Sequence, residues 1–97
     1  MEKRDYIIIL YDIYGELLNE KQKQYFEEYY FNNLSLGEIS DNLNISRNAV
    51  HKCLIGVEEK LYFFENKLKL YEKNNIIRDI INLETNEALK KRLEELI

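Results

Sequence analysis

The amino-acid sequence predicts an all-α protein from its composition, its helix-capping patterns and the spacing of its apolar residues. The chain has 97 residues with no proline and three glycines, so few residues would interrupt a helix. Apolar side chains recur three or four residues apart along most of the chain, as on one face of a helix. A hydrophobic content of 45% at this length supports one modest core, so we expect a single helical domain over residues 1–97.

The first helix is expected over Lys3–Leu18. Its main apolar stripe consists of Ile7, Leu10, Tyr14 and either Leu17 or Leu18. Further apolar residues lie off this stripe, namely Ile8, Ile9, Tyr11 and Ile13. We therefore expect this helix to be buried on two sides.

A second helix is expected to run to about Phe31. Asn19 is followed three residues later by Gln22, a capping pattern in which side chains satisfy free backbone groups at a helix start. The side chains expected to be buried are Phe26, Tyr29 and Tyr30. The pair Asn32 and Asn33 should end the helix.

A short third helix is predicted over Leu36–Leu43. Ser35 and Glu38 form a capping box, in which each side chain satisfies a backbone N–H donor. The buried stripe would consist of Ile39 and Leu43. Asn44 comes next, and asparagine tolerates the left-handed backbone that a tight turn between helices needs.

The fourth helix should begin after Ser46, a good capping residue. Its inward positions keep helical spacing and are Val50, Cys53, Leu54 and Val57. Apart from Gly56, no strong breaker follows until Asn74 and Asn75. This predicts a helix of about 27 residues, about 40 Å long.

Two helices joined by a tight turn, as expected from Ser35 to Leu54, form a helix-turn-helix, whose second helix enters the DNA major groove in many regulators. The exposed N-terminal half of that recognition helix would present Arg47, Asn48, His51 and Lys52. These four side chains are candidates for contacting double-stranded DNA. Helix pairs of this kind also occur in proteins that never touch DNA, so a protein-binding role stays open.

The net charge of −4 weighs against DNA binding, because most DNA-binding proteins carry a basic surface. Between Asn42 and Val57, however, the only charged residues are Arg47 and Lys52. Exposed charges act over roughly 10 Å at moderate salt, so this face would be mildly basic. We expect weak, salt-sensitive binding.

The long helix carries a heptad seam, in which apolar residues lie alternately four and three positions apart. The seam comprises Val50, Leu54, Val57, Leu61, Phe64, Leu68 and Tyr71. Other helices of the same chain or a second copy could cover it. A helix of this length would extend beyond so small a core, so we expect a homodimer. The packing seam of the dimer would include Leu61, Phe64, Leu68 and Tyr71.

The remaining residues predict a short C-terminal helical tail. One helix would carry Ile76, Ile77, Ile80 and Ile81, and a last helix, capped by Thr85 or Asn86, would carry Leu89, Leu93 and Leu96. We expect these side chains to bury against the seam or a partner. The domain would then comprise a helix-turn-helix bundle over residues 1–57 and an extended helix with its tail over residues 58–97.

No residues form a recognisable catalytic or metal site. Cys53 is the only cysteine, which excludes an internal disulfide and a cysteine-based zinc site. His51 is the only histidine and has no carboxylate four residues on, so a metal-ligand role is disfavoured. Most tyrosines and phenylalanines lie on helical stripes, where core packing explains them better than stacking on bases. We expect no enzyme activity and no cofactor.

The longest apolar run, Tyr6 to Tyr11, is far shorter than the roughly 20 residues that a membrane span needs. The sequence shows no signal peptide and has one cysteine. We therefore expect a cytoplasmic protein without a membrane span.

Taken together, these motifs resemble the YlxM-like family of small bacterial proteins and, behind it, region 4 of sigma-70-type sigma factors. The resemblance covers roughly Tyr11 to Glu72. Its most specific parts are LLNEKQKQYFEEYYFNNLSLGEISDNLNISRNAV, with KQ, YY, SLGEI and SRNAV in the family's order and spacing, and EEKLYFFENKLKLYEK. The resemblance implies an all-helical cytoplasmic protein, often dimeric, that acts as a DNA-binding regulator linked to the signal recognition particle pathway. That link rests on neighbouring genes.

The resemblance to sigma region 4 also implies where DNA would be contacted. The implied DNA-binding set is Ser35, near a phosphate, with Ser46, Arg47, Asn48, His51 and Lys52. Where family members carry basic residues late in the recognition helix, this chain has Leu54, Ile55 and Gly56. The regions with which a sigma factor binds polymerase and melts promoters are absent, so we do not expect a complete sigma factor.

Two other functions remain as alternatives. A non-enzymatic adaptor would keep the fold without DNA binding and dock on a component of the targeting machinery through its acidic surface and hydrophobic seam. The net charge of −4 and Ile55 favour this alternative. An RNA-binding role has less support, because the sequence shows neither a stacking sheet nor a basic arm.

Overall fold

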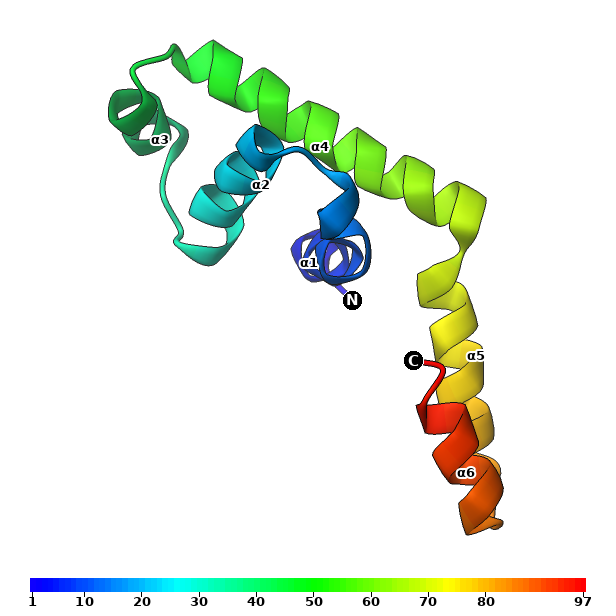
Figure 1. Ribbon diagram of the computed structural model, residues 1–97. Helices are drawn as coiled ribbons and strands as arrows, with labels where there is room; N and C mark the ends of the chain where they lie inside the picture. The colour runs from blue at the N-terminus through cyan, green and yellow to red at the C-terminus, as the bar shows by residue number, and fades with distance from the viewer.

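The computed structural model describes residues 1–97 and contains helices and no strand. The helices are α1 (Lys3–Tyr14), η1 (Gly15–Leu17), α2 (Glu20–Phe26), η2 (Glu27–Phe31), α3 (Leu36–Leu43), α4 (Arg47–Leu68), α5 (Leu70–Leu83) and α6 (Glu87–Glu94). Figure 1 shows α4 lying across α1 and α2, with α3 at its N-terminal end and α5 and α6 leaving its C-terminal end. The predicted all-α fold is confirmed, and α3 and α4 form the predicted pair of helices joined by a turn.

One core cluster lies where α1, α2 and η2 pack against α4. Its buried residues are Ile7, Leu10, Tyr14, Leu18, Phe26, Tyr30, Val57 and Leu61. The Phe26 ring stacks on Tyr11 and on Tyr30, with ring centroids 4.1 Å and 4.4 Å apart. Aromatic pairs at such distances stabilise a core beyond their apolar burial. These rings are therefore engaged in packing, as the sequence predicts.

A second cluster joins α2, α3 and α4 beneath the turn. Its buried residues are Tyr25, Ile39, Val50 and Leu54. Cys53 is half-buried and packs against both clusters. Burial raises the pKa of the Cys53 thiol, and the positive charge of Lys21 partly opposes the rise. A thiol with a raised pKa is a poor nucleophile, which fits a packing role for Cys53.

The first helix is shorter than predicted. α1 ends at Tyr14, and the 3₁₀ turn η1 redirects the chain so that Leu18 is buried and Leu17 is 57% exposed. Gly15 allows this turn to pack closely, because a Cβ there would lie 3.2 Å from the Tyr11 ring.

The second helix is capped as predicted and then changes its winding. The Gln22 N–H donates to Asn19 Oδ1 at 2.8 Å, and the Asn19 N–H donates to Gln22 Oε1 at 3.0 Å. The segment η2 is a π-helix, whose wider turn changes which side chains face the core. Tyr29, predicted to be buried, is only partly so, and Tyr25, on α2 before this segment, is buried.

The predicted helix of about 27 residues is wrong. α4 has 22 residues and ends at Leu68, after which Lys69 adopts a left-handed conformation with φ 56°. Neither glycine nor proline marks this break, and α5 starts directly at Leu70. The direction of the chain changes sharply here, as Figure 1 shows.

A buried carboxylate stabilises the break. The Tyr14 hydroxyl donates to Glu65 Oε1 at 2.6 Å, and the N–H groups of Tyr71 and Glu72 donate to the same carboxylate at 3.0 Å and 3.2 Å. The Leu70 N–H donates to Tyr14 Oη at 3.1 Å. These bonds satisfy N–H groups of the first turn of α5, which have no partner within their own helix. Burial and the bond to Glu65 raise the pKa of Tyr14 to about 12, so its hydroxyl stays protonated and donates.

The heptad seam lies mainly inside the chain. Four of its residues are buried in the two clusters, namely Val50, Leu54, Val57 and Leu61. The Phe64 ring lies 5.9 Å from Tyr14, and the Tyr71 ring lies 5.4 Å from Tyr6. Leu68 is 44% exposed. Leu61 is therefore enclosed by its own chain, while Leu68 is free to meet another molecule.

The helices α5 and α6 form a C-terminal arm, residues 70–97, that projects from the bundle (Figure 1). Asn86 caps α6 by accepting the Leu89 N–H at 3.1 Å, as predicted. Neither helix contains a buried residue, and exposed apolar side chains of the arm include Ile76, Ile80, Leu83, Leu89 and Leu96. The tail therefore does not bury against the seam, and its burial against a partner, the other alternative, stays a prediction. No helix has both the length and the apolar character to cross a membrane.

Candidate nucleic-acid interface

The turn between α3 and α4 is fixed by hydrogen bonds. The Ser40 hydroxyl donates to the Ile45 carbonyl at 2.6 Å, and the Ile45 N–H donates to the Ser40 carbonyl at 3.1 Å. Asn44 has φ 55° and ψ 46°, the left-handed conformation that the sequence predicts. Ser46 Oγ accepts the Ala49 N–H at 3.0 Å and starts α4. The direction of α4 relative to α3 is thereby set.

Replacing Asn44 by alanine should lower the free energy of unfolding by about 1 kcal/mol, because a Cβ-bearing residue without a local polar group is strained in the left-handed region. Asn44→Gly is the control and should change it by less than about 0.5 kcal/mol, since glycine adopts this conformation readily. Urea unfolding followed by circular dichroism measures both values. Equal losses in the two variants would show that the asparagine side chain, not the backbone conformation, is what the turn requires.

The outer face of the first two turns of α4 is uncovered. The side chains of Arg47, Asn48, His51 and Lys52 are all exposed, as the sequence predicts for a recognition helix. None of the ion pairs in the structure involves Arg47 or Lys52. The arm leaves the opposite end of α4 (Figure 1). The structure therefore brings the four candidates together on one free surface with two uncompensated positive charges.

Arg47 lies against α3, a contact that the sequence pattern did not predict. A Cβ built on Gly37 would come within 2.9 Å of Arg47 Nη2 and 3.0 Å of Arg47 Cζ. The guanidinium group therefore occupies the space that any larger residue would fill. The glycine of SLGEI is the signal in the sequence, because glycine inside a short helix costs stability unless something packs closely there.

Carboxylates limit this positive surface. Ser35 Oγ accepts the Glu38 N–H and Glu38 Oε1 accepts the Ser35 N–H, both at 3.1 Å. The Ser35 hydroxyl proton stays free to donate, but the hydroxyl lies next to the Glu38 carboxylate, which disfavours an anionic partner there. Further along α4, Glu59 is exposed seven residues after Lys52, a spacing that places both on one helical face. The surface suited to an anionic partner thus ends before Glu59.

The arrangement offers hydrogen-bonding groups and positive charge. A guanidinium group presents several donors in one plane, and an asparagine amide both donates and accepts, so Arg47 and Asn48 have the chemistry that reads base edges. No group of three or more His, Cys, Asp or Glu side chains is placed to hold a metal ion.

Comparison with known proteins places the chain in a family. A family profile described as "Putative helix-turn-helix protein, YlxM / p13 like" matches residues 1–97. The chain belongs to this family. The resemblance to YlxM-like proteins is thereby confirmed, and the match extends past Glu72 over the C-terminal arm. The sequence of the arm is therefore part of the YlxM / p13-like family pattern.

Several relatives of the YlxM / p13-like chain align over most of its length. It is 42% identical over 94 residues to a UPF0122 protein of Ureaplasma parvum serovar 3, covering 97% of this chain and 95% of the relative. It is 42% identical over 92 residues to a UPF0122 protein of Fusobacterium nucleatum, covering 91% and 89%. For a UPF0122 protein of Caldanaerobacter subterraneus the identity is 49% over 69 residues, covering 71% and 59%.

Proposed function

We propose that this protein is a DNA-binding regulator that inserts the N-terminal half of α4 into the major groove. The observation that carries the proposal is the free surface of Arg47, Asn48, His51 and Lys52 on a helix whose start is fixed by hydrogen bonds. Arginine and asparagine bond base edges in pairs of hydrogen bonds, and lysine bonds guanine or phosphate. Ser35 and Ser46 lie at the starts of α3 and α4, where N–H groups and hydroxyls suit phosphates.

The affinity should fall moderately as the salt concentration rises. The chain has a net charge of −4, and Glu38 and Glu59 border the basic surface. Neutralising one phosphate changes the slope of log affinity against log salt by about −0.9. With Arg47 and Lys52 as the cations of the surface, we expect a slope of roughly −2 for each bound copy.

Selection of bound duplexes from a random DNA pool at low salt tests this function. We expect a recurring sequence to be enriched, because Arg47, Asn48 and Lys52 face base edges in the proposed complex. Absence of enrichment, together with no binding to genomic fragments at low salt, would contradict the proposal.

We also propose that the protein forms a homodimer through its C-terminal arm. Two short helices that bury no residue are marginal alone in water, and the arm exposes apolar side chains along both. A two-fold contact between two arms would cover these side chains. Leu68, exposed at the base of the arm, could extend the contact. Such a dimer would present two copies of α4 to paired half-sites.

The double substitution Ile76→Ser and Ile80→Ser should convert the protein to a monomer, because both side chains are about half-exposed on α5 and lie one turn apart. Light scattering at micromolar concentration measures the mass. The control is Leu17→Ser, which changes an exposed leucine on the bundle and should leave the dimer intact. A monomeric mass for the unaltered chain would rule the dimer out.

We propose that this regulator acts in the signal recognition particle pathway, in the cytoplasm, as the resemblance to YlxM-like proteins implies. A protein-binding adaptor of the same pathway is the second candidate, favoured by the net charge of −4 and by Ile55, which is 40% exposed beside the recognition surface. A pull-down treated with nuclease separates them. Partners that survive the treatment support the adaptor, and partners that disappear after it support the DNA reader.

A further inference from the structure

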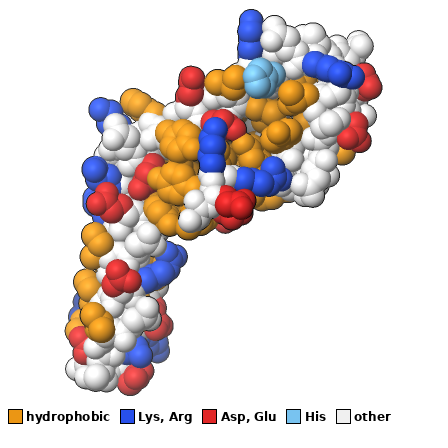
Figure 2. Space-filling view, turned by 180° about the vertical axis from the view of Figure 1, so that it is seen from behind, with side chains coloured by type: hydrophobic (Ala, Val, Ile, Leu, Met, Phe, Trp, Pro, Cys, Tyr) orange, Lys and Arg blue, Asp and Glu red, His pale blue; other side chains and the backbone are white.

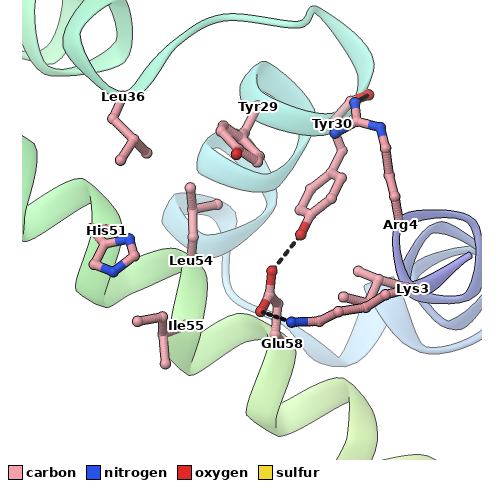
Figure 3. Close-up of a pocket in the computed structure, with 10 residues that line it drawn as sticks. Lys3, Arg4, Tyr29, Tyr30, Leu36, His51, Leu54, Ile55 and Glu58 are labelled. Atoms are coloured by element: carbon pink, nitrogen blue, oxygen red, sulfur yellow. Dashed lines mark hydrogen bonds and ion pairs between the residues drawn. The ribbon is translucent and has the colours of Figure 1, made fainter.

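A groove of about 640 Å³ lies beside α4, on the side that faces the start of α1. Figure 3 shows it between α4, which carries His51 and Ile55, and α1, which carries Lys3 and Arg4. The groove is open to solvent rather than an enclosed cavity. In Figure 2 an apolar surface is seen on this face, next to the histidine, with Lys and Arg as well as Asp and Glu side chains around it.

The floor of the groove is apolar. Ile7 and Leu54 are almost fully buried and form its base, while Tyr29 and Leu36 are partly exposed at its sides. Ile55 is 40% exposed at its edge. These side chains come from four different elements, so the fold itself builds the concave shape. No other part of the chain covers it, because the arm projects from the far end of α4 (Figure 1).

The rim of the groove is positive although the whole chain is negative. The Lys3 side chain is 71% exposed, with its Nζ 3.9 Å from Glu58 Oε2. Glu58, the only carboxylate that lines the groove, also accepts the Tyr30 hydroxyl, so both of its oxygens are engaged. Arg4 uses one Nη for the Tyr30 carbonyl at 2.8 Å and Asn33 Oδ1 at 3.1 Å, which leaves other guanidinium donors free.

We propose that this groove binds an amphipathic helix of a protein partner that carries carboxylates beside its apolar face. An apolar floor accepts side chains spaced at i, i+3 or i+4 and i+7 of a helix, and the flanking charges select the partner. A small molecule fits less well, because small-molecule sites enclose most of their ligand and this groove is open. Because Lys3 and Arg4 outnumber Glu58, whose oxygens are already engaged, the rim is complementary to acidic residues of a partner.

Occupation of the groove would also block the DNA surface, an inference that rests on the proposed function. His51 and Ile55 are side chains of α4, and they wall the groove on the side of the recognition surface. A helix seated there covers His51, so the duplex and the partner compete for α4. Partner binding would therefore release the protein from DNA.

Selection of helical peptides from a random phage-displayed library against the full chain tests the groove. We expect the enriched peptides to carry leucine-like residues at helical spacing and more Asp and Glu than Lys and Arg. Ile55→Glu, which puts a negative charge at the edge of the apolar floor, should abolish binding of an enriched peptide. Lys3→Glu should weaken it about fivefold or more, because reversing a rim charge replaces attraction by repulsion. Lys60→Glu is the matched control on an exposed lysine outside the groove and should bind as the unaltered chain does.

The proposal is overturned by a library that yields no binder, by enriched peptides that are basic or neutral, or by equal binding to the Lys3→Glu and Lys60→Glu variants. Groove amide signals that change on dilution of the protein alone would also overturn it, by showing that a second copy occupies the groove. Displacement of the selected DNA duplex by the peptide would support the coupling. If the peptide binds without displacing the duplex, the groove proposal stands and only the competition between peptide and DNA is overturned. If the peptide binds although the chain binds no DNA, the groove proposal stands and the proposed function fails.

Discussion

The double substitution Arg47→Ala and Lys52→Ala is expected to weaken binding to the selected DNA duplex by about a hundredfold. A good contact to a base is worth roughly 1–3 kcal/mol, and about 1.4 kcal/mol corresponds to a factor of ten in affinity. Both side chains are exposed and lack ion-pair partners, so the unbound protein gives up no ion pair when they meet DNA. Fluorescence anisotropy at several salt concentrations measures the affinity, and the salt slope should fall by about one for each phosphate that the variant no longer neutralises.

The matched control for this experiment is Lys60→Ala with Lys67→Ala. It removes two positive charges from exposed positions later on α4, so the net charge changes equally. We expect it to weaken binding by less than about threefold, since these lysines lie beyond Glu59 and away from the first turns. Circular dichroism checks that both variants fold. Equal weakening by the two double substitutions would mean that overall charge, rather than the start of α4, holds the DNA.

Glu65→Leu is expected to lower the free energy of unfolding by about 3 kcal/mol. The Glu65 carboxylate accepts hydrogen bonds from the Tyr14 hydroxyl and from two N–H groups of α5, and each such bond to a charged acceptor contributes roughly 1–3 kcal/mol. Leucine would leave the buried hydroxyl without its acceptor. Because α5 starts on this carboxylate, amide hydrogen exchange at Leu70, Tyr71 and Glu72 should accelerate more than exchange in the bundle.

Two further variants make the Glu65 experiment specific. Glu65→Gln keeps one acceptor oxygen and should lose less stability than Glu65→Leu. Glu59→Leu changes an exposed carboxylate on the same helix and should alter the free energy of unfolding by less than about 0.5 kcal/mol. Urea unfolding compares all three. If Glu65→Leu is as stable as Glu59→Leu, the carboxylate does not anchor the arm.

Features set by neighbouring residues were predictable from the sequence. The capping boxes at Asn19 and Ser35, the bounds of α3 and the left-handed Asn44 all depend on residues within a few positions of each other. The candidate contacts on α4 follow from the same local reasoning, because a capped helix with a buried stripe determines which side chains face outward. The exposure of Arg47 and His51 is an example.

Features that depend on distant residues were not predictable. The break at Lys69 is stabilised by Tyr14, which is far away in the sequence, and no glycine or proline near Lys69 predicts it. The position of Arg47 over Gly37 depends on how α3 packs against α4. The groove beside Ile55 exists only because four elements converge, and no single segment carries its pattern. The arm was misplaced for the same reason, since its direction follows from the break.

The central claim is that the start of α4 lies in a DNA groove, and chemical-shift mapping tests it most directly. Isotope-labelled protein is titrated with the selected duplex, and the backbone amide signals are followed residue by residue. The proposed function predicts that the largest changes fall on Ser35 and on residues 46–52, while residues 70–97 of the arm stay unchanged. Changes confined to the arm, or no change at saturating duplex, would contradict it.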